Sequence, residues 1–168
     1  MILIALGSNL PSAAGTPAET LAAALSALEA NDVRPLKVSR FYRSDAWPDP
    51  REPPFVNAVA QIGTTLHPSR LLEVLHGVER SFGRERAVRN APRTLDIDVL
   101  DYDGRVESGP PVLPHPRMED RAFVLVPLAE IKPQWRHPVS QCSVAQLLVA
   151  LADGASGVRP LSSTPPVR

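Results

Sequence analysis

The sequence predicts one domain in which β-strands alternate with amphipathic helices, and three local patterns lead to this prediction. Residues 95–99 alternate between large apolar residues and aspartates, which is typical of a strand buried on one side. Residues 2–6 are a short apolar run that a Gly-Ser-Asn turn ends. Residues 16–19, Thr-Pro-Ala-Glu, combine an N-cap, a proline at the first helical position and a capping box, and leucines follow at helical spacing. We therefore expect a sheet covered by helices.

Length and composition limit the class of protein. A chain of 168 residues is one domain of ordinary size. Its 18 basic and 18 acidic residues balance, so no overall field attracts nucleic acid or a membrane surface, and any anion site must be local. The single Cys142 excludes an internal disulfide and fits a reducing compartment. Neither a signal peptide nor an apolar run of about 20 residues is present, so we expect a cytoplasmic protein.

The remaining elements follow from similar signals. Extended segments are expected at residues 33–42 and 55–64, and helices after His67 and after a second capping box that begins at Ser143. Proline-rich connections lie at residues 44–54 and 110–116. Gly, Ser and Pro dominate from residue 154 onward, so we expect one domain over residues 1–153 and a flexible tail over 154–168.

The strongest functional signal is a cluster of arginines directly followed by two aspartates. Four arginines lie between residues 84 and 93, and Asp96 and Asp98 then share one face of a predicted strand. Their Cα atoms would lie roughly 6.5 to 7 Å apart, so both carboxylates could hold a hard cation such as Mg²⁺. Arginine matches phosphate bidentately, and this combination suits phosphoryl transfer. The same pattern has a second interpretation, in which the aspartates lie on a solvated strand face and form surface ion pairs that have no function. The basic residues of this chain are nearly all arginine, so a local cluster of arginines need not be special.

A few other polar or aromatic residues have two interpretations each. Asn57 lies inside an apolar strand and must find partners, so it either orients the backbone or binds a polar ligand edge. Trp47, in a proline-rich loop, either lines a substrate or caps the core. His115 lies between two prolines and is either structural or a positioned contact. His76 and Glu79 share a helix face.

Taken together, seven blocks of this sequence resemble the 6-hydroxymethyl-7,8-dihydropterin pyrophosphokinase family. The strongest block is Pro-Arg-Thr-Leu-Asp-Ile-Asp-Val-Leu at residues 92–100. The others lie in family order at residues 7–10, 39–44, 55–59, 83–86, 113–118 and 121–123, and together they span about residues 1–150. Each short block is weak alone, whereas the set is specific.

The resemblance implies a fold and an activity. The implied fold is an α+β, ferredoxin-like three-layer α/β/α sandwich with a largely antiparallel sheet. The implied reaction transfers the pyrophosphoryl group of ATP to the hydroxymethyl oxygen of 6-hydroxymethyl-7,8-dihydropterin, in folate biosynthesis, and leaves AMP. The implied partners are these two small molecules and two Mg²⁺ ions, with neither nucleic acid nor membrane, and we expect a monomer.

The resemblance also implies roles for individual residues. Asp96 and Asp98 would hold the two Mg²⁺ ions, and with Arg84 and Arg93 they would form the catalytic group. The residues implied to bind ATP are His76, Glu79, Arg84, Arg86, Arg93, Ile97, His115 and Arg121. The residues implied to bind the pterin are Ser44, Asp45, Trp47, Phe55, Asn57, Asp96 and Phe123, with the two phenylalanines on either side of the ring.

Two departures from the family pattern and two alternative functions remain open. Asn90-Ala91 stands where the family often has Trp-Gly, in a loop one residue shorter, and Pro116 replaces an aromatic residue found in some members. One alternative is a non-catalytic module that binds single-stranded nucleic acid through stacking aromatics, although the zero net charge and paired aspartates disfavour it. The other is a family member that binds pterin or nucleotide without turnover.

Overall fold

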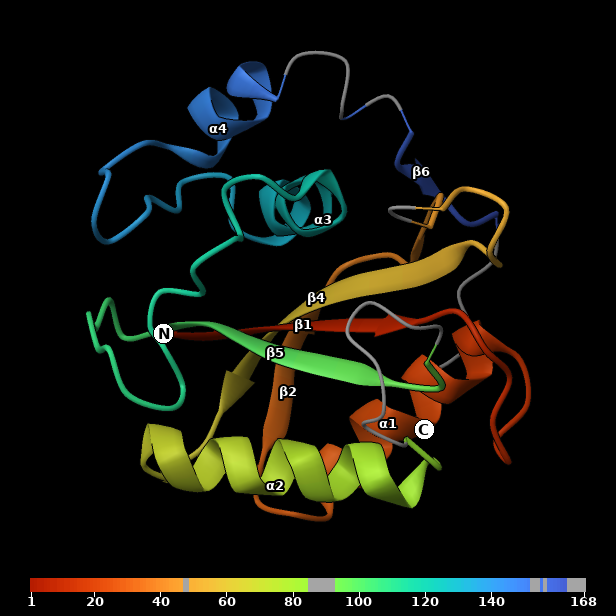
Figure 1. Ribbon diagram of the computed structural model, residues 1–168. Coiled ribbons are helices and arrows are strands. Elements are labelled where there is room, and N and C mark those ends of the chain that lie inside the picture. The colour runs from red at the N-terminus through yellow and green to blue at the C-terminus, as the bar shows by residue number, and fades with distance from the viewer. Residues whose placement is uncertain (47–48, 85–92, 152–154, 156, 163–168) are drawn as a thin grey trace.

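An antiparallel sheet lies between two pairs of helices in the computed structural model (Figure 1). The structure describes residues 1–46, 49–84, 93–151, 155 and 157–162. The elements within these ranges are β1 (Ile2–Ser8), α1 (Pro17–Glu29), β2 (Arg34–Val38), β3 (Tyr42–Ser44), β4 (Phe55–Gly63), α2 (Pro68–Ser81), β5 (Asp96–Tyr102), α3 (Ala122–Ile131), α4 (Val144–Ala150) and β6 (Arg159–Pro160).

The strand order identifies the fold as ferredoxin-like. The strands follow the order β5-β1-β4-β3-β6, and β2 also pairs with β4. Without the short strands β3 and β6, the order β5-β1-β4-β2 is that of two interleaved β-α-β units. Every described strand pair is antiparallel. The fold class expected from the sequence is confirmed.

Both predicted capping boxes form. At the start of α1, the Thr16 hydroxyl accepts the N–H of Glu19 at 3.4 Å, and the Glu19 carboxylate accepts the N–H of Thr16 at 2.8 Å. At the start of α4, Ser143 and Gln146 exchange the equivalent pair of hydrogen bonds. Each box satisfies N–H groups that a helix start leaves unpaired, so these two boundaries follow from local sequence.

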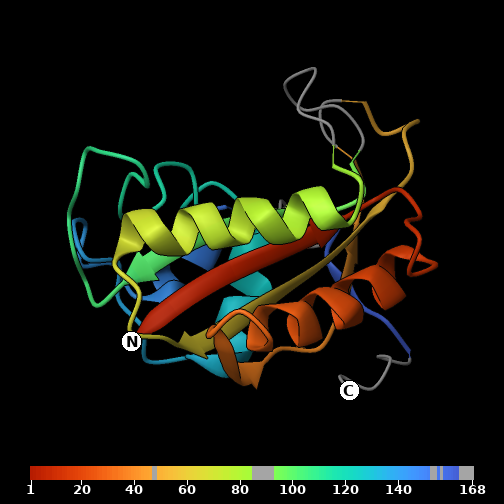
Figure 2. The ribbon, with the colours of Figure 1, turned by 90° about the horizontal axis from the view of Figure 1, so that it is seen from below.

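Two hydrophobic cores lie on opposite faces of the sheet. In β1, Ile2, Ile4 and Leu6 contribute to the core under α1 and α2, whereas Leu3 contributes to the core under α3 and α4. This alternation follows from the two-residue period of a strand. Figure 2 shows α1 and α2 side by side on one face of the sheet.

The same alternation in β5 determines where the two aspartates point. Ile97 and Val99 are buried in the core under α1 and α2, while Leu100 is buried in the core under α3 and α4. Asp96 and Asp98 therefore project from the α3 side of the sheet, on one face of the strand as the sequence predicts.

The strand β5 extends through Tyr102, although the composition of residues 101–104, Asp-Tyr-Asp-Gly, is typical of a turn. Asp101 and Tyr102 are part of the strand, and both are buried. The Asp101 carboxylate accepts the indole N–H of Trp135 at 2.8 Å and the N–H of Gly104 at 2.9 Å. The turn begins only at Asp103 and Gly104, which both have positive φ angles. Composition misplaced the boundary because Asp101 finds buried partners.

The C-terminal segment returns to the sheet. β6 pairs with β3, with Pro160 opposite Tyr42 and Arg159 opposite Arg43. The N–H of Leu161 then donates to the carbonyl of Phe41 at 2.8 Å. Part of the stretch expected to be a flexible tail is thus paired with a strand. Across the described ranges, no helix combines the length and the apolar character needed to cross a membrane.

Candidate functional site

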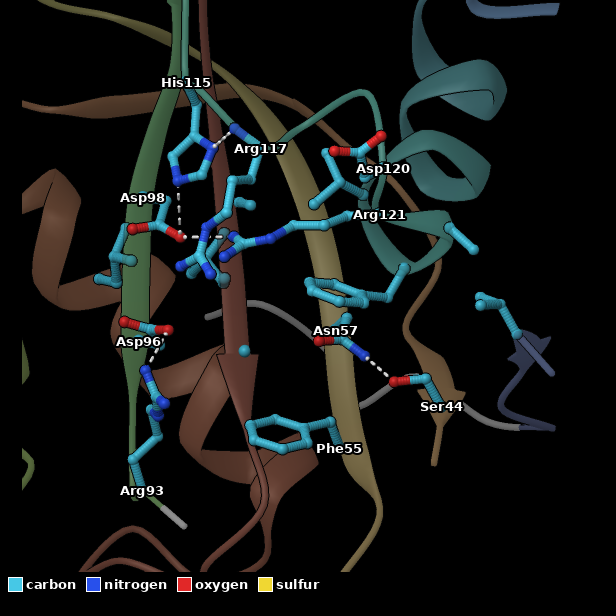
Figure 3. Close-up of a pocket in the computed structure, with 18 of the residues that line it drawn as sticks. Ser44, Phe55, Asn57, Arg93, Asp96, Asp98, His115, Arg117, Asp120 and Arg121 are labelled. Atoms are coloured by element: carbon cyan, nitrogen blue, oxygen red, sulfur yellow. Dashed lines mark hydrogen bonds and ion pairs between the residues drawn. The ribbon is translucent and has the colours of Figure 1, made fainter. Parts of the chain in front are cut away.

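A cavity of about 700 Å³ opens on the α3 side of the sheet, next to β5, β1 and β4. All the predicted site residues that the structure describes line this cavity; Trp47 and Arg86 lie outside the described residues. These lining residues are Ser44, Asp45, Phe55, Asn57, His76, Glu79, Arg84, Arg93, Asp96, Ile97, Asp98, His115, Arg121 and Phe123. Figure 3 shows charged side chains gathered over β5, with Phe55 and Asn57 on β4 across the cavity.

Asp96 binds two arginines from the loop that precedes its strand. One carboxylate oxygen accepts from Nη1 of Arg93 at 2.7 Å, and the other accepts from Nη1 of Arg84. The Asp96 side chain keeps 25% of its surface exposed, so it remains accessible from the cavity. Two guanidinium groups are therefore held at one carboxylate, in a position where a phosphate could exchange with it.

Glu79 anchors Arg84 from below the cavity. Its side chain is buried, and its Oε1 atom accepts both from Nη1 of Arg84 and from the backbone N–H of Ile97 at 2.8 Å. A buried carboxylate requires such partners. Glu79 thus connects α2 to β5 and fixes the guanidinium of Arg84 beside Asp96.

Asp98 has a second set of cationic neighbours. Its Oδ2 atom lies 3.3 Å from Nη1 of Arg121 and 3.6 Å from Nε2 of His115. Burial lowers the pKa of His115 below its ordinary value; the charge of Asp98 opposes this shift, and Arg121 and Arg117 add to it. His115 is therefore neutral near pH 7, which leaves one arginine as the bound cation at Asp98.

Asn9 holds the start of the aspartate strand in place. Its side-chain oxygen accepts the N–H of Arg93 at 2.8 Å, and its own N–H donates to the carbonyl of Arg93 at 3.1 Å. Its amide nitrogen donates to the carbonyl of Pro53 at 3.1 Å. Asn9 therefore joins the end of β1 to the arginine segment and to the proline-rich loop before β4. The Gly-Ser-Asn turn, which could have presented N–H groups to a ligand, uses the N–H of Asn9 for a structural contact instead.

The opposite side of the cavity carries a buried amide, a buried hydroxyl and two aromatic rings. The Asn57 amide nitrogen donates to the Ser44 hydroxyl at 2.9 Å, and both side chains are buried (Figure 3). Gly7 lies against this pair, since a Cβ atom there would lie 3.2 Å from the Asn57 oxygen. Phe55 and Phe123 add aromatic surface to the lining. This side suits a planar, polar-edged ring.

Arg121 connects the two sides. Its guanidinium binds Asp98 and also lies over the Phe123 ring, 5.5 Å from the ring centroid. A cation over an aromatic face is attracted by the ring quadrupole. One side chain thereby links the charged side of the cavity to an aromatic side chain that we expect beside the substrate ring.

The carboxylate pair fits a hard divalent cation. Asp96 and Asp98 project from one strand face into the cavity, and the atoms that they offer to a metal ion are all carboxylate oxygens. The described residues hold no cluster of three or more His, Cys, Asp or Glu side chains suited to a closed metal site. Mg²⁺ is typically held by one or two carboxylates together with water and substrate phosphates, so this donor set suits Mg²⁺ carried in with a phosphate ligand.

The cavity also includes residues that the sequence did not single out. Leu72, Arg117, Asp120 and Val158 line it, and none of them is among the predicted site residues. Leu72 lies on α2 beside the buried Leu71. Arg117 lies in the same sequence block as His115, residues 113–118, and its charge is near enough to affect that histidine. Val158 lies in the segment expected to be a tail.

Comparison with known proteins gives a family match over most of the chain. The sequence profile described as 7,8-dihydro-6-hydroxymethylpterin-pyrophosphokinase (HPPK) matches residues 3–133. The chain is 42% identical over 139 residues to the 2-amino-4-hydroxy-6-hydroxymethyldihydropteridine pyrophosphokinase of Pseudomonas aeruginosa, covering 82% of this chain and 83% of that protein.

Longer proteins match over one part of their length. The chain is 33% identical over 153 residues to the folic acid synthesis protein fol1 of Pneumocystis carinii, which covers 90% of this chain and only 20% of fol1. A crystal structure of HPPK-DHPS from Plasmodium falciparum superposes with a TM-score of 0.70 over 95% of this chain and 46% of that chain. The sequence identity in that superposition is 11%, so it supports the fold alone.

Proposed function

Because the chain belongs to the 7,8-dihydro-6-hydroxymethylpterin-pyrophosphokinase family, we propose that it transfers the β,γ-pyrophosphoryl group of ATP to the hydroxymethyl oxygen of 6-hydroxymethyl-7,8-dihydropterin. The observation that carries the proposal is one cavity with two unlike sides. Arginines bound to two aspartates lie on one side, and a buried amide with aromatic neighbours lies on the other. The products are AMP and the pterin diphosphate.

The charged side binds the triphosphate. The guanidinium groups of Arg84, Arg93 and Arg121 exchange their carboxylate partners for phosphate oxygens, which they match in charge and geometry. Glu79 keeps Arg84 in place during this exchange, since its carboxylate also binds the backbone of Ile97. His115, which lies beside Asp98 in the cavity lining, contacts the nucleotide.

The exchange frees the carboxylates of Asp96 and Asp98 for Mg²⁺. We propose two ions, which Asp96 and Asp98 would hold. Mg²⁺ held there would neutralise charge on the phosphate oxygens and make phosphorus easier to attack. Until ATP arrives, the arginines balance the charge of both aspartates.

The side of the cavity that is lined by Asn57, Phe55 and Phe123 binds the pterin ring. Asn57 is fixed by Ser44, so its oxygen is oriented toward the polar edge of the ring. Phe55 and Phe123 contact the ring faces. Arg121, which contacts both Phe123 and Asp98, helps to hold the ring and the phosphates in fixed positions relative to each other.

The chemical step is an in-line displacement. The hydroxymethyl oxygen releases its proton to solvent and forms a bond to the β-phosphorus, while the bond from that phosphorus to the oxygen bridging it to the α-phosphorus breaks. AMP leaves with the bridging oxygen, and the γ-phosphate travels with the β-phosphate. Arg84 and Arg93 stabilise the charge that gathers on the equatorial oxygens, and the two-sided cavity holds the reactants in position.

The test is to identify the nucleotide product. Protein incubated with Mg²⁺, ATP and 6-hydroxymethyl-7,8-dihydropterin should form one AMP for each pterin consumed, and a chelator should stop the reaction. Formation of ADP would contradict the proposal, because it would mean that only one phosphoryl group is transferred.

A further inference from the structure

We propose that the C-terminal segment forms one wall of the pterin side of the cavity, and that Val158 contacts the bound ring. The family match ends at residue 133, so it assigns nothing to this segment. Gly157 and Val158 nevertheless line the cavity together with Ser44, Asp45 and Phe123. The inference rests on the function proposed above, because it names a further contact for the same substrate.

Strand pairing determines where Val158 lies. In the pairing of β3 with β6, Pro160 is opposite Tyr42 and Arg159 is opposite Arg43. The same antiparallel register, continued by one residue, places Val158 opposite Ser44. Directly opposed residues in an antiparallel pair project to the same face of the sheet. Val158 is therefore expected on the face of Ser44, the residue whose hydroxyl binds the Asn57 amide.

The exposures of Val158 and Arg159 agree with this placement, although Pro160 is exposed opposite the buried Tyr42. In β3, Tyr42 and Ser44 are buried and Arg43 between them is exposed. Across the pair, Arg159 is exposed like Arg43, and Val158 is half-buried. Val158 is an apolar side chain at the edge of the cavity, next to the polar pair Ser44 and Asn57. If this pair binds the polar edge of the pterin, Val158 is placed to contact an apolar part of the same ring.

The segment is also held firmly enough to serve as a wall. Beyond the strand, the N–H of Leu161 donates to the carbonyl of Phe41 at 2.8 Å, and the Leu161 side chain packs against the core under α1 and α2. Before the strand, the N–H of Val158 donates to the carbonyl of Ala155 at 3.2 Å. Val158 therefore lies between two fixed points.

The test is a binding measurement that does not depend on turnover. The dissociation constant of 6-hydroxymethyl-7,8-dihydropterin is measured by fluorescence, with Mg²⁺ and a non-hydrolysable ATP analogue present, for wild type and Val158→Ala. The expected result is an increase of about fivefold in that constant, as for the loss of one or two apolar groups from a pocket. Affinity for the ATP analogue alone should not change. Val158→Ile, which keeps an apolar branched side chain, should bind within about twofold of wild type.

Val149→Ala is the matched control. Val149 is 81% exposed on α4 and does not line the cavity, so the same truncation there should leave pterin binding unchanged. If Val158→Ala bound the pterin as tightly as Val149→Ala, the proposed contact between Val158 and the ring would be refuted. The proposed function would not be affected by that result. If wild type bound no pterin at all, the proposed function and this inference would fall together.

Discussion

Asn9 and Arg93 lie 84 positions apart in the sequence, yet each donates its backbone N–H to the other residue. This reciprocal contact fixes the segment that enters β5 at the end of β1. Arg93, one of the two arginines that bind Asp96, is therefore positioned by a residue that does not itself line the cavity.

Replacing Asn9 should weaken both stability and catalysis. Asn9→Ala leaves the partly buried N–H of Arg93 without this acceptor, so the free energy of unfolding should fall by about 1–3 kcal/mol. The rate of AMP formation at saturating substrates should fall at least about tenfold, because Arg93 is displaced from the phosphates. Urea unfolding and steady-state kinetics measure the two effects.

A surface asparagine provides the control for that change. Asn31→Ala removes a side-chain hydrogen bond to the carbonyl of Ala27 on the exposed end of α1, away from the cavity. It should leave the rate unchanged. An Asn9→Ala protein that is destabilised yet has a wild-type rate would show that Asn9 acts on stability alone.

Neutralising either strand aspartate should stop turnover while the fold survives. Asp96→Asn and Asp98→Asn keep the shape of the side chain but lose the charge that Mg²⁺ requires, so turnover should fall at least about 10²-fold. Circular dichroism checks the fold, and titration of the ATP analogue with and without Mg²⁺ should show that Mg²⁺ no longer strengthens binding.

Asp103→Asn is the matched change outside the site, because Asp103 is exposed and pairs with the N-terminal amine. It should keep full activity. Near-normal turnover in either strand variant would contradict the assignment of the metal to these carboxylates.

Glu79 should matter chiefly for stability. Glu79→Ala leaves the largely buried Arg84 with one carboxylate fewer and the N–H of Ile97 without an acceptor, so unfolding should become easier by about 3 kcal/mol. Denaturant unfolding measures this. Glu73→Ala, on the exposed face of the same helix, should change stability by less than about 1 kcal/mol. Equal stability of the two variants would contradict the anchoring role of Glu79.

His115 should titrate below its ordinary pKa in the ligand-free protein, because burial disfavours the imidazolium. The unfolded chain then binds more protons than the folded one as the pH falls below 6.5, so acidification through that range should reduce stability. NMR titration of the imidazole measures the pKa directly. His115→Gln should lose less stability than wild type between pH 7.5 and 5.5.

The sequence predicts best what depends on near neighbours. Alternation over residues 95–99 places Asp96 and Asp98 on one strand face, and the capping boxes at Thr16 and Ser143 locate two helix starts, because these signals lie within a few residues. The helix α3 gives no such local signal, since it is apolar nearly all round and contains Pro127.

What the sequence misses depends on distant pairing. No local pattern indicates that Asn9 binds Arg93 or that Asp101 binds Trp135, since each partner lies on another element. The strand β6 consists of two exposed residues, Arg159 and Pro160, so it shows no alternation of its own and forms only through its pairing with β3. For the same reason, the position of Val158 in the cavity lining cannot be predicted from the sequence.

Phosphorus NMR of the protein with Mg²⁺, ATP and 6-hydroxymethyl-7,8-dihydropterin tests the central claim most directly, because it follows all three phosphorus atoms of ATP. The account predicts that the β and γ resonances convert together into those of a diphosphate ester of the pterin while the α-phosphorus becomes AMP, and that Asp98→Asn shows neither change. A pterin monophosphate with ADP, or ATP that is hydrolysed without modifying the pterin, would contradict it.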